Sequence, residues 1–171
     1  MNLENLKSKL LELIPYILII IGVVLIRSYL YTPIKVNGTS MDPTLKQNDL
    51  MILSKIGLKS GLNRWDVVVV KEDSKYIIKR VIGLPGESVA YIDGKLYINK
   101  KNVEDNYSKS KTNDFDEIYL SDDEYFVMGD NRIVSADSRI IGPIKKDQIL
   151  GKTSFRFFPF NKIGNVEWIL I

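Results

Sequence analysis

The sequence of 171 residues contains neither cysteine nor histidine. Without cysteine it forms no disulfide bond, and cysteine usage gives no information about the redox compartment. Without histidine it has no Ser-His-Asp triad, and without either residue it has no Cys-His dyad and no ordinary zinc site. A hydrolytic enzyme with this composition needs a different base.

Other common signatures are missing as well. The chain has no Asp-x-Asp-x-Asp-Gly loop for calcium and no GxxxxGKS/T loop for phosphate. Its net charge is +3, and lysine and arginine are mixed with acidic residues instead of forming the basic stripe of a nucleic-acid protein. A magnesium or calcium site made only of carboxylates stays open on composition, but these absences favour no metal ion, no cofactor and no nucleic-acid partner. The length suits one modest domain with a short appendage.

A long apolar segment lies near the N-terminus. Leu13–Ile26 reads LIPYILIIIGVVLI and carries no charge. As a helix with ~1.5 Å per residue, the longer segment Leu10–Tyr31 would measure about 33 Å, close to the ~30 Å of a hydrocarbon core. Tyr16, Tyr29 and Tyr31 stand near its expected interfaces, where aromatic rings collect. The segment therefore predicts a transmembrane anchor.

Two alternatives to an anchor fit the apolar segment less well. A cleaved secretory peptide would end in small residues, whereas this segment ends in Arg-Ser-Tyr-Leu-Tyr, residues 27–31. A buried core helix would be amphipathic rather than apolar all round. Charge does not settle the orientation, because Lys7 and Lys9 on one side balance Arg27 and Lys35 on the other.

The chain after Pro33 consists of short runs rich in β-branched residues and bounded by turn residues. Asp93-Gly94, between alternating apolar residues, predicts a hairpin with a type I′ turn. Residues 100–117 are polar, and we expect a mobile surface excursion there. The pattern predicts a mainly β fold, an antiparallel β domain of folded-over sheets, with strands in Leu50–Lys55, Asp66–Lys71, Lys75–Gly83, Val89–Asn99, Glu124–Asn131 and Lys152–Phe158.

A serine in the segment VNGTSMDPTL, Val36–Leu45, is a candidate nucleophile. Ser40 could equally serve only the turn, since serine favours such positions. As a nucleophile it needs a base, and without histidine the candidates are Lys, Asp, Glu and Tyr. A lysine can serve when burial lowers its pKa from ~10.4 to about 8, a shift that costs roughly 3 kcal/mol.

Lys79, in the run YIIKRVI, is a lysine of that kind. In a strand it shares a face with Ile77 and Val81. Arg80, however, lies equally among apolar residues on the other face. The alternation therefore indicates a buried charge on at least one face without saying which, and a lysine on the exposed face of an edge strand stays an alternative.

A dense polar cluster, GDNRIVSADSR, occupies Gly129–Arg139. Its aspartates and arginines could be ion pairs that pin a hairpin loop. Alternatively, Ser135 could hydrogen-bond the lysine nitrogen and fix its aim. A carboxylate close to that lysine would raise its pKa, so we expect Asp130 to pair with an arginine, most naturally Arg80.

These segments together resemble the type I signal peptidases. An N-terminal anchor is followed by YTPIKVNGTSMDPTL, NDLMILSK, YIIKRVIGLPGE and YFVMGDNRIVSADSR, in the family's order and over nearly the whole chain. The short central insertion is similar to the compact version of Gram-positive bacteria. The resemblance implies a signal-peptidase-like fold and a membrane-bound serine endopeptidase. Such an enzyme removes signal peptides from secreted preproteins, cleaves after small residues of the Ala-x-Ala type and needs no cofactor.

The resemblance also implies roles for individual residues. Ser40 would be the nucleophile and Lys79 the general base, with Ser135 orienting the lysine. Gly38 stands where some members have a serine that helps to hold the oxyanion, so the second oxyanion donor stays open. Structural support would come from Arg80, Asp130, Asp137 and Arg139, and substrate contacts from Ile34, Val36, Met41, Leu45 and Ile78.

In this interpretation, residues 1–9 are cytoplasmic, residues 10–31 form the membrane anchor, and residues 32–171 form an extracytoplasmic peptidase domain with a mobile insertion at about 100–120. The protein would cross the cell membrane once. Its partners would be the lipid bilayer and preproteins emerging from the secretion machinery. Two other functions stay open on the sequence: a non-catalytic, membrane-tethered binding or scaffold protein, and a self-cleaving Ser-Lys repressor-like peptidase.

Overall fold

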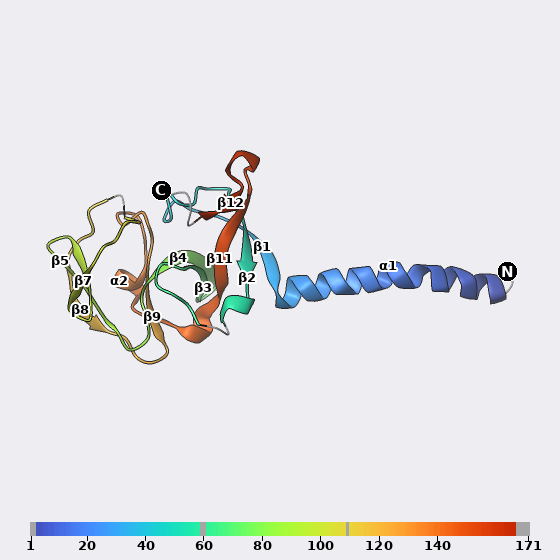
Figure 1. Ribbon diagram of the computed structural model, residues 1–171, viewed down its shortest axis with the longest axis horizontal. Helices are drawn as coiled ribbons and strands as arrows, with labels where there is room; N and C mark the ends of the chain where they lie inside the picture. The colour runs from blue at the N-terminus through green and yellow to red at the C-terminus, as the bar shows by residue number, and fades with distance from the viewer. Residues whose placement is uncertain (1–2, 59–60, 109, 167–171) are drawn as a thin grey trace.

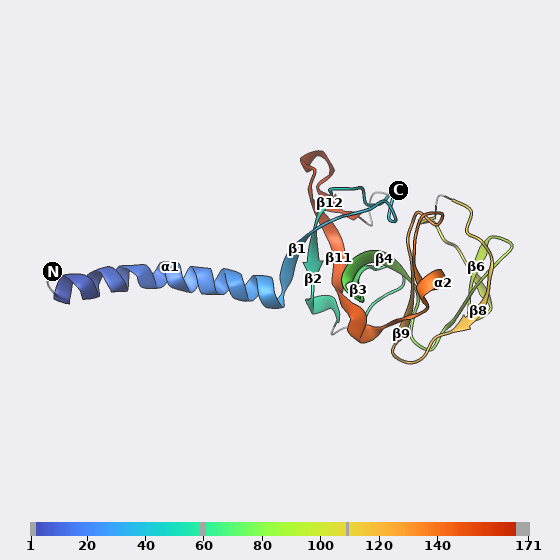
Figure 2. The same ribbon diagram turned by 180° about the vertical axis from the view of Figure 1, so that it is seen from behind.

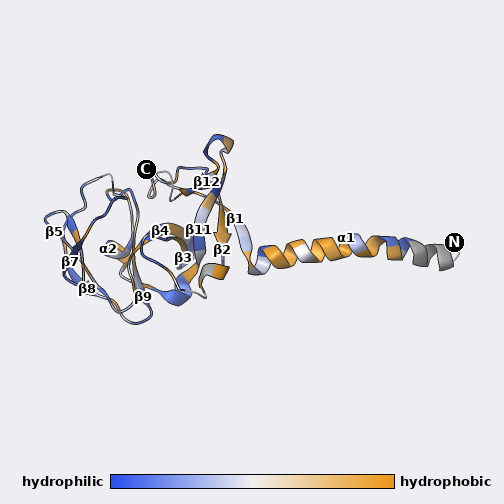
Figure 3. Ribbon diagram, viewed as in Figure 1, coloured by the Kyte–Doolittle hydropathy of each residue, from blue (hydrophilic) through white to orange (hydrophobic). Residues whose placement is uncertain are grey.

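The computed structural model describes residues 3–58, 61–108 and 110–166. One long helix, α1 (Leu3–Tyr29), projects from a body of β-sheets (Figures 1 and 2). Its segment Leu11–Tyr29 has a mean hydropathy of 2.1, and none of its residues is buried in the body. Figure 3 shows the same segment as a nearly continuous apolar stretch. The alternative of a buried core helix is therefore wrong, and the helix is long and apolar enough to cross a membrane.

The predicted helical length, Leu10–Tyr31, is wrong at its C-terminal end. The Leu30 N–H still donates to the carbonyl oxygen of Ile26 at 2.9 Å, but Tyr31 already pairs with Ser54 of a β-ladder. Because the ladder takes up the backbone groups from Tyr31 onward, the helix ends at Tyr29, and only Leu30 separates it from the first strand.

Two antiparallel sheets make up the body. The larger sheet lies next to α1 and the smaller one at the far end of the molecule (Figures 1 and 2). The larger sheet has the order β1 (Tyr31–Lys35), β2 (Leu50–Ser54), β11 (Ile149–Phe158), β3 (Val67–Glu72), β4 (Lys75–Gly83), β9 (Glu124–Met128) and β10 (Ile144–Lys145), with β12 (Gly164–Asn165) paired to β11. The smaller sheet has the order β7 (Lys101–Val103), β6 (Lys95–Ile98), β5 (Ser88–Ile92) and β8 (Phe115–Tyr119).

Short helical segments complete the described chain. They are α2 (Ser138–Ile141) and the 3-10 turns η1 (Ile56–Leu58), η2 (Lys146–Gln148) and η3 (Phe160–Lys162). The predicted mainly β, antiparallel architecture is confirmed, and each run predicted as a strand contains one. The Asp-Gly hairpin is also confirmed, because Asp93 and Gly94 both have positive φ, 52° and 72°, as a type I′ turn requires.

Strands β4 and β9 are covered on both faces because alternate residues enter different cores. Val81 and Val127 belong to one apolar cluster, and Ile82 and Phe126 belong to a second cluster, shared with the smaller sheet. A strand covered on both faces buries every side chain of its central part, polar ones included. This arrangement decides the environment of the charged residues on β4.

The polar excursion at residues 100–117 is more ordered than its composition predicts. It includes β7 and the beginning of β8, and Val103, Phe115 and Ile118 pack against the second cluster. Tyr107 lies with its ring 3.7 Å from the guanidinium carbon of Arg80. A few apolar residues spaced among charges therefore hold this segment onto the body.

Gly83 is a point of close approach between the two sheets. A Cβ at this position would lie 2.5 Å from Val89 Cγ2 and 2.7 Å from Leu120 Cδ1. We expect Gly83→Ala to destabilise the full-length protein in detergent by about 1–3 kcal/mol, as overpacked cores do. Urea denaturation followed by circular dichroism measures the change. Gly22→Ala is the control, since nothing lies within 4 Å of a Cβ there. An unchanged midpoint for Gly83→Ala would contradict the packing argument.

Candidate active site

Ser40 lies in a tight turn between β1 and β2. The Asp42 N–H donates to the Thr39 carbonyl at 3.1 Å, which closes the turn. Asn131 fixes the turn from the other side: its N–H donates to the Ser40 carbonyl at 3.0 Å, and its side-chain amide donates to the Thr39 carbonyl at 3.3 Å. Met41 is buried, whereas Ser40 keeps partial access to solvent. The turn therefore holds the serine at the surface of the core.

Lys79 reaches this serine from β4. Its Nζ donates a hydrogen bond of 2.9 Å to Ser40 Oγ, and the residue is only 3% exposed. The alternative of an exposed lysine on an edge strand is wrong, because β4 lies between β3 and β9. The sequence left open whether Lys79 or Arg80 is the buried charge, and the structure buries both.

Burial lowers the pKa of Lys79 below its ordinary value, because the ammonium loses hydration in the protein interior. Asp137 acts in the opposite direction, and smaller contributions of the same sign come from Glu72 and Asp130. Arg139 adds to the lowering. Loss of water outweighs the carboxylates, so the neutral amine exists at lower pH than in an exposed lysine. A neutral Nζ has the lone pair that a general base needs.

Arg80 forms the predicted ion pair with Asp130. Its Nε donates to Asp130 Oδ1 at 2.8 Å and its Nη2 to Oδ2 at 2.6 Å, and both side chains are fully buried. Nη1 donates to the carbonyl of Trp65 at 2.9 Å. This bidentate geometry satisfies the carboxylate next to the dyad.

Asp137 and Arg132, the other charged residues discussed for the Gly129–Arg139 segment, have different kinds of ion-pair partner. Asp137 accepts hydrogen bonds of 2.8 Å from Nε and Nη2 of Arg139 and one of 2.9 Å from the Gly129 N–H. Burial alone would raise the pKa of Asp137, but these donors lower it below its ordinary value. Arg132 is hydrogen-bonded within this segment, since its Nε donates to the Gly129 carbonyl at 2.9 Å and its own carbonyl accepts from Arg139 Nη2 at 2.8 Å, but its ion pair lies outside the segment. It forms an ion pair of 2.7 Å with Asp105 of the excursion, which sequence reasoning missed.

Ser135 is buried but does not make the predicted hydrogen bond to Lys79. Its Oγ has no hydrogen-bond partner among the residues that the structure describes. A Cβ at Gly129 would overlap Ser135 Oγ and lie 2.5 Å from the Ser40 carbonyl oxygen. The absence of a side chain at Gly129 therefore lets Ser135 and Ser40 approach each other, a role that the sequence did not reveal.

The backbone near Ser40 offers one open donor. Within the described part of the chain, the Ser40 N–H donates to no acceptor. Gly38, with φ of 107°, has its N–H bonded to Oε1 of Gln47, whose amide in turn donates to Asn37 Oδ1 at 3.1 Å. The Gly38 N–H is therefore occupied in this conformation. Sequence reasoning also missed the contribution of Gln47 to this turn.

An apolar cavity of about 660 Å³ extends along β1 and β4. Ile34 and Ile78, two of the predicted substrate residues, line it, together with Thr32, Lys35, Asn37, Leu53, Lys55, Val69, Tyr76, Ile149 and Leu150. The other three, Val36, Met41 and Leu45, do not reach the cavity. They form a buried cluster against which Ile34 and Ile78 pack, because their side chains point into the core below the turn.

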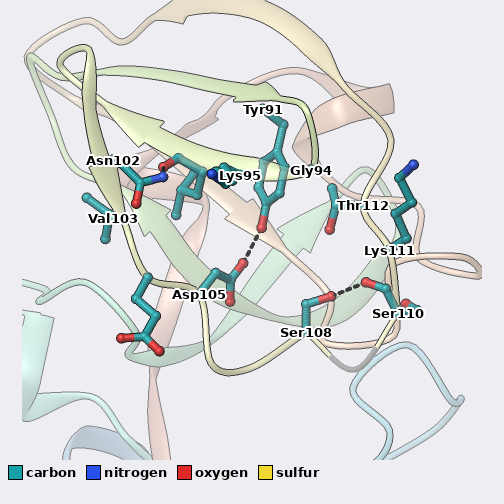
Figure 4. A pocket seen from close by; sticks show the side chains of 12 residues that line it. Tyr91, Gly94, Lys95, Asn102, Val103, Asp105, Ser108, Ser110, Lys111 and Thr112 are labelled. Carbon is teal, nitrogen blue, oxygen red and sulfur yellow. Dashed lines mark hydrogen bonds between the residues drawn. The ribbon is translucent and has the colours of Figure 1, made fainter.

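A second cavity, of about 390 Å³, lies in the smaller sheet (Figure 4). Its polar groups contact one another: Tyr91 donates to Asp105 at 2.5 Å, and Ser108 donates to the Ser110 carbonyl at 2.6 Å. It contains neither Ser40 nor Lys79. Residues 3–58, 61–108 and 110–166 contain no cluster of three or more acidic side chains placed to hold a metal ion.

Comparison with known proteins identifies the family to which this chain is similar. The model of the family described as signal peptidase, peptidase S26, matches residues 10–158. Signal peptidase I of Bacillus amyloliquefaciens is 40% identical over 94% of this chain and 95% of that protein. Signal peptidase I S of Bacillus subtilis (strain 168) is 37% identical over 95% and 98%.

A protein from another genus, signal peptidase IB of Staphylococcus aureus (strain N315), is 37% identical over 91% of this chain and 93% of its own length. The crystal structure of a signal peptidase I from Enterococcus faecalis V583 is 31% identical, with a TM-score of 0.49 over 53% of this chain and 95% of that chain. Because the family match and the relatives at 37–40% identity cover nearly the whole sequence, the chain belongs to the signal peptidase I family, whose members remove signal peptides from secreted preproteins.

Proposed function

We propose that Ser40 and Lys79 are the catalytic dyad of this peptidase. The observation that carries the proposal is the 2.9 Å hydrogen bond between Lys79 Nζ and Ser40 Oγ. It joins a serine with partial access to solvent to a lysine that is almost completely removed from water. A nucleophile within hydrogen-bond reach of a base is the arrangement that acyl transfer requires.

The reaction steps follow from that contact. Neutral Lys79 takes the proton of Ser40 Oγ while this oxygen attacks the carbonyl carbon of the scissile bond. The open Ser40 N–H donates to the oxyanion that forms. The Lys79 ammonium then protonates the departing amine and leaves an acyl-enzyme. The lysine, neutral again, takes a proton from the water that hydrolyses this ester and gives it to Ser40 Oγ as that oxygen leaves, which restores the free enzyme.

The predicted supporting residues act by neutralising charge and fixing geometry. Arg80 satisfies Asp130, and Arg139 satisfies Asp137, so neither carboxylate makes an ion pair with Lys79. We assign Ser135 to the packing around the dyad, since its hydroxyl is buried there. Gly38 gives the turn a φ that favours glycine.

The substrate would lie extended in the apolar cavity. Strand β1 pairs only with β2 in the described sheet, so its other edge is free to bind a peptide backbone. Ile34 of β1 and Ile78 of β4 form apolar parts of the cavity wall. Their branched side chains leave room for small side chains next to the scissile bond, which supports cleavage of the Ala-x-Ala type.

The proposed location is the cell membrane, crossed once by α1, with residues 1–9 inside and the peptidase domain outside. The apolar length of Leu11–Tyr29 supports the membrane crossing. The secretion of the substrates supports the placement of the peptidase domain outside the cell membrane. The partners would be the bilayer and signal-peptide-bearing preproteins. A non-catalytic scaffold would not need a dehydrated lysine against a serine, and no observation favours a self-cleaving repressor.

Replacement of either dyad residue tests the proposal. We expect Ser40→Ala and Lys79→Ala to remain folded and to cleave a preprotein at least about 10³-fold more slowly, as losses of a nucleophile or its base do. Lys79→Arg should be equally inactive, because a guanidinium stays protonated. Gel-based processing assays and circular dichroism measure both effects. Lys71→Ala, on an exposed residue of β3, is the matched control. Folded dyad variants that process at the normal rate would refute the dyad.

The pH dependence tests the charge arrangement around Lys79. Activity should rise with pH as Lys79 loses its proton, at a pH below the ordinary lysine pKa of ~10.4. Arg139→Met removes a cation and exposes Lys79 to the unpaired carboxylate of Asp137, so the pKa of Lys79 should increase. We expect the acid limb of kcat/KM to move up by about one pH unit with the high-pH plateau retained. Arg64→Met, which breaks an ion pair with Glu87, is the control. A limb that stays in place or moves down would contradict this account.

A further inference from the structure

The structure assigns Lys55 a positioning role: it ties the end of the anchor helix to the substrate cavity and so sets how far outside the bilayer the cleaved bond lies. This inference rests on the proposed function, because it concerns the same cavity and the same dyad. It makes Lys55 a residue that selects substrates by length rather than by side chain.

Lys55 holds the last turn of α1. Its Nζ donates to the Ser28 carbonyl at 2.8 Å, and its N–H donates to the Leu30 carbonyl at 3.0 Å. Thr32 adds a third contact, from Oγ1 to the Arg27 carbonyl at 3.0 Å. The last carbonyls of a helix lack partners within it and carry partial negative charge, so an ammonium group suits this position.

The connection between the helix α1 and the larger sheet is very short. Only Leu30 lies between α1 and β1, and β1 pairs with β2 from its first residue. Lys55 follows the last residue of β2 directly. The donors that hold the helix thus lie on β1 (Thr32) and directly after β2 (Lys55). Because these strands are fixed in the sheet, the three hydrogen bonds set the direction in which α1 leaves the body.

The same side chains form one end of the substrate cavity. Thr32 and Lys55 line it beside the helix, whereas Asn37 and Ile78 line it near the dyad. From Thr32 to Asn37, an extended chain advances by about five residues, or roughly 17 Å at ~3.3 Å per residue. An extended substrate beside β1 would need about the same number of residues to pass from the bilayer surface to Ser40.

A helix held in a fixed direction therefore selects substrates by the length of their polar segment between the bilayer and the cleavage site. The apolar part of a signal peptide stays in the bilayer, and its cleavage site must reach Ser40. A shorter polar segment would not reach, and a longer one would have to loop, which lowers the effective concentration of the scissile bond. If the side-chain contact of Lys55 to Ser28 is removed, only the backbone contact and Thr32 hold the helix, so that the domain can tilt on α1 and substrates of other lengths become acceptable.

The test uses the full-length protein reconstituted in lipid vesicles. Preproteins share one apolar segment and one cleavage site, and the polar segment between them increases from about three to about nine residues, around the extended span of β1. For each variant, the cleavage rate is divided by that variant's own rate on a short soluble peptide with the same site. This ratio separates changes in length selection from changes in chemistry.

The wild type should favour about five residues, and Lys55→Ala should raise the relative rate of the longest substrate by about fivefold. Thr32→Val, which removes the third contact and keeps the branched shape, should change the profile in the same direction. Lys55→Arg should restore the wild-type profile. Lys35→Ala is the matched control: Lys35 also lines the cavity, but its side chain makes no hydrogen bond to α1 within the described residues.

An unchanged length profile in both Lys55→Ala and Thr32→Val would overturn the inference, as would an equal change in Lys35→Ala. If the wild type does not cleave the soluble peptide and Ser40→Ala still processes preproteins, the proposed dyad is wrong and the inference is refuted with it. The two failures are therefore distinguishable.

Discussion

The removal of one lysine ammonium from water is the constraint on which the rest of this structure depends. Each pKa unit by which Lys79 falls costs ~1.4 kcal/mol of differential stabilisation, which the surrounding fold must offset. The position of β4 provides the environment, since it lies inside the sheet and is covered on both faces. Strand alternation then directs Lys79 toward Ser40 and Arg80 to the opposite face, where it meets Asp130.

Much of this site could be predicted because its elements are local in sequence. The absence of histidine reduced the residue types that could act as the base of Ser40, and the apolar neighbours of Lys79 identified this lysine as a candidate. The Asp93-Gly94 turn was equally local, because its positive φ angles depend only on these two residues. The alternation of residues along the strand could not show that Arg80 is buried as well as Lys79. That required the neighbours of β4, which are set by pairing between distant segments.

Contacts between distant polar segments left no pattern in the sequence. The Asp105–Arg132 pair and the ring of Tyr107 over Arg80 hold an excursion that composition alone predicts to be mobile. The contact between Lys55 and the end of α1 is of the same kind. Such contacts depend on where two chains meet after folding. The composition of these segments reflects their many solvent-exposed residues. It does not identify the few side chains that make contacts with the rest of the fold.

The pairing of buried charges explains how the pKa of Lys79 stays lowered in so polar an interior. In the described part of the chain, every other buried arginine, lysine or aspartate has an opposite charge within 4.0 Å, whereas Lys79 has none. A carboxylate left without its arginine would attract the ammonium form of Lys79 and raise its pKa. In the proposed dyad, these ion pairs help Lys79 by keeping the surrounding carboxylates paired with arginines. They satisfy the surrounding carboxylates, so that dehydration is the largest influence on the one amine that must lose its proton.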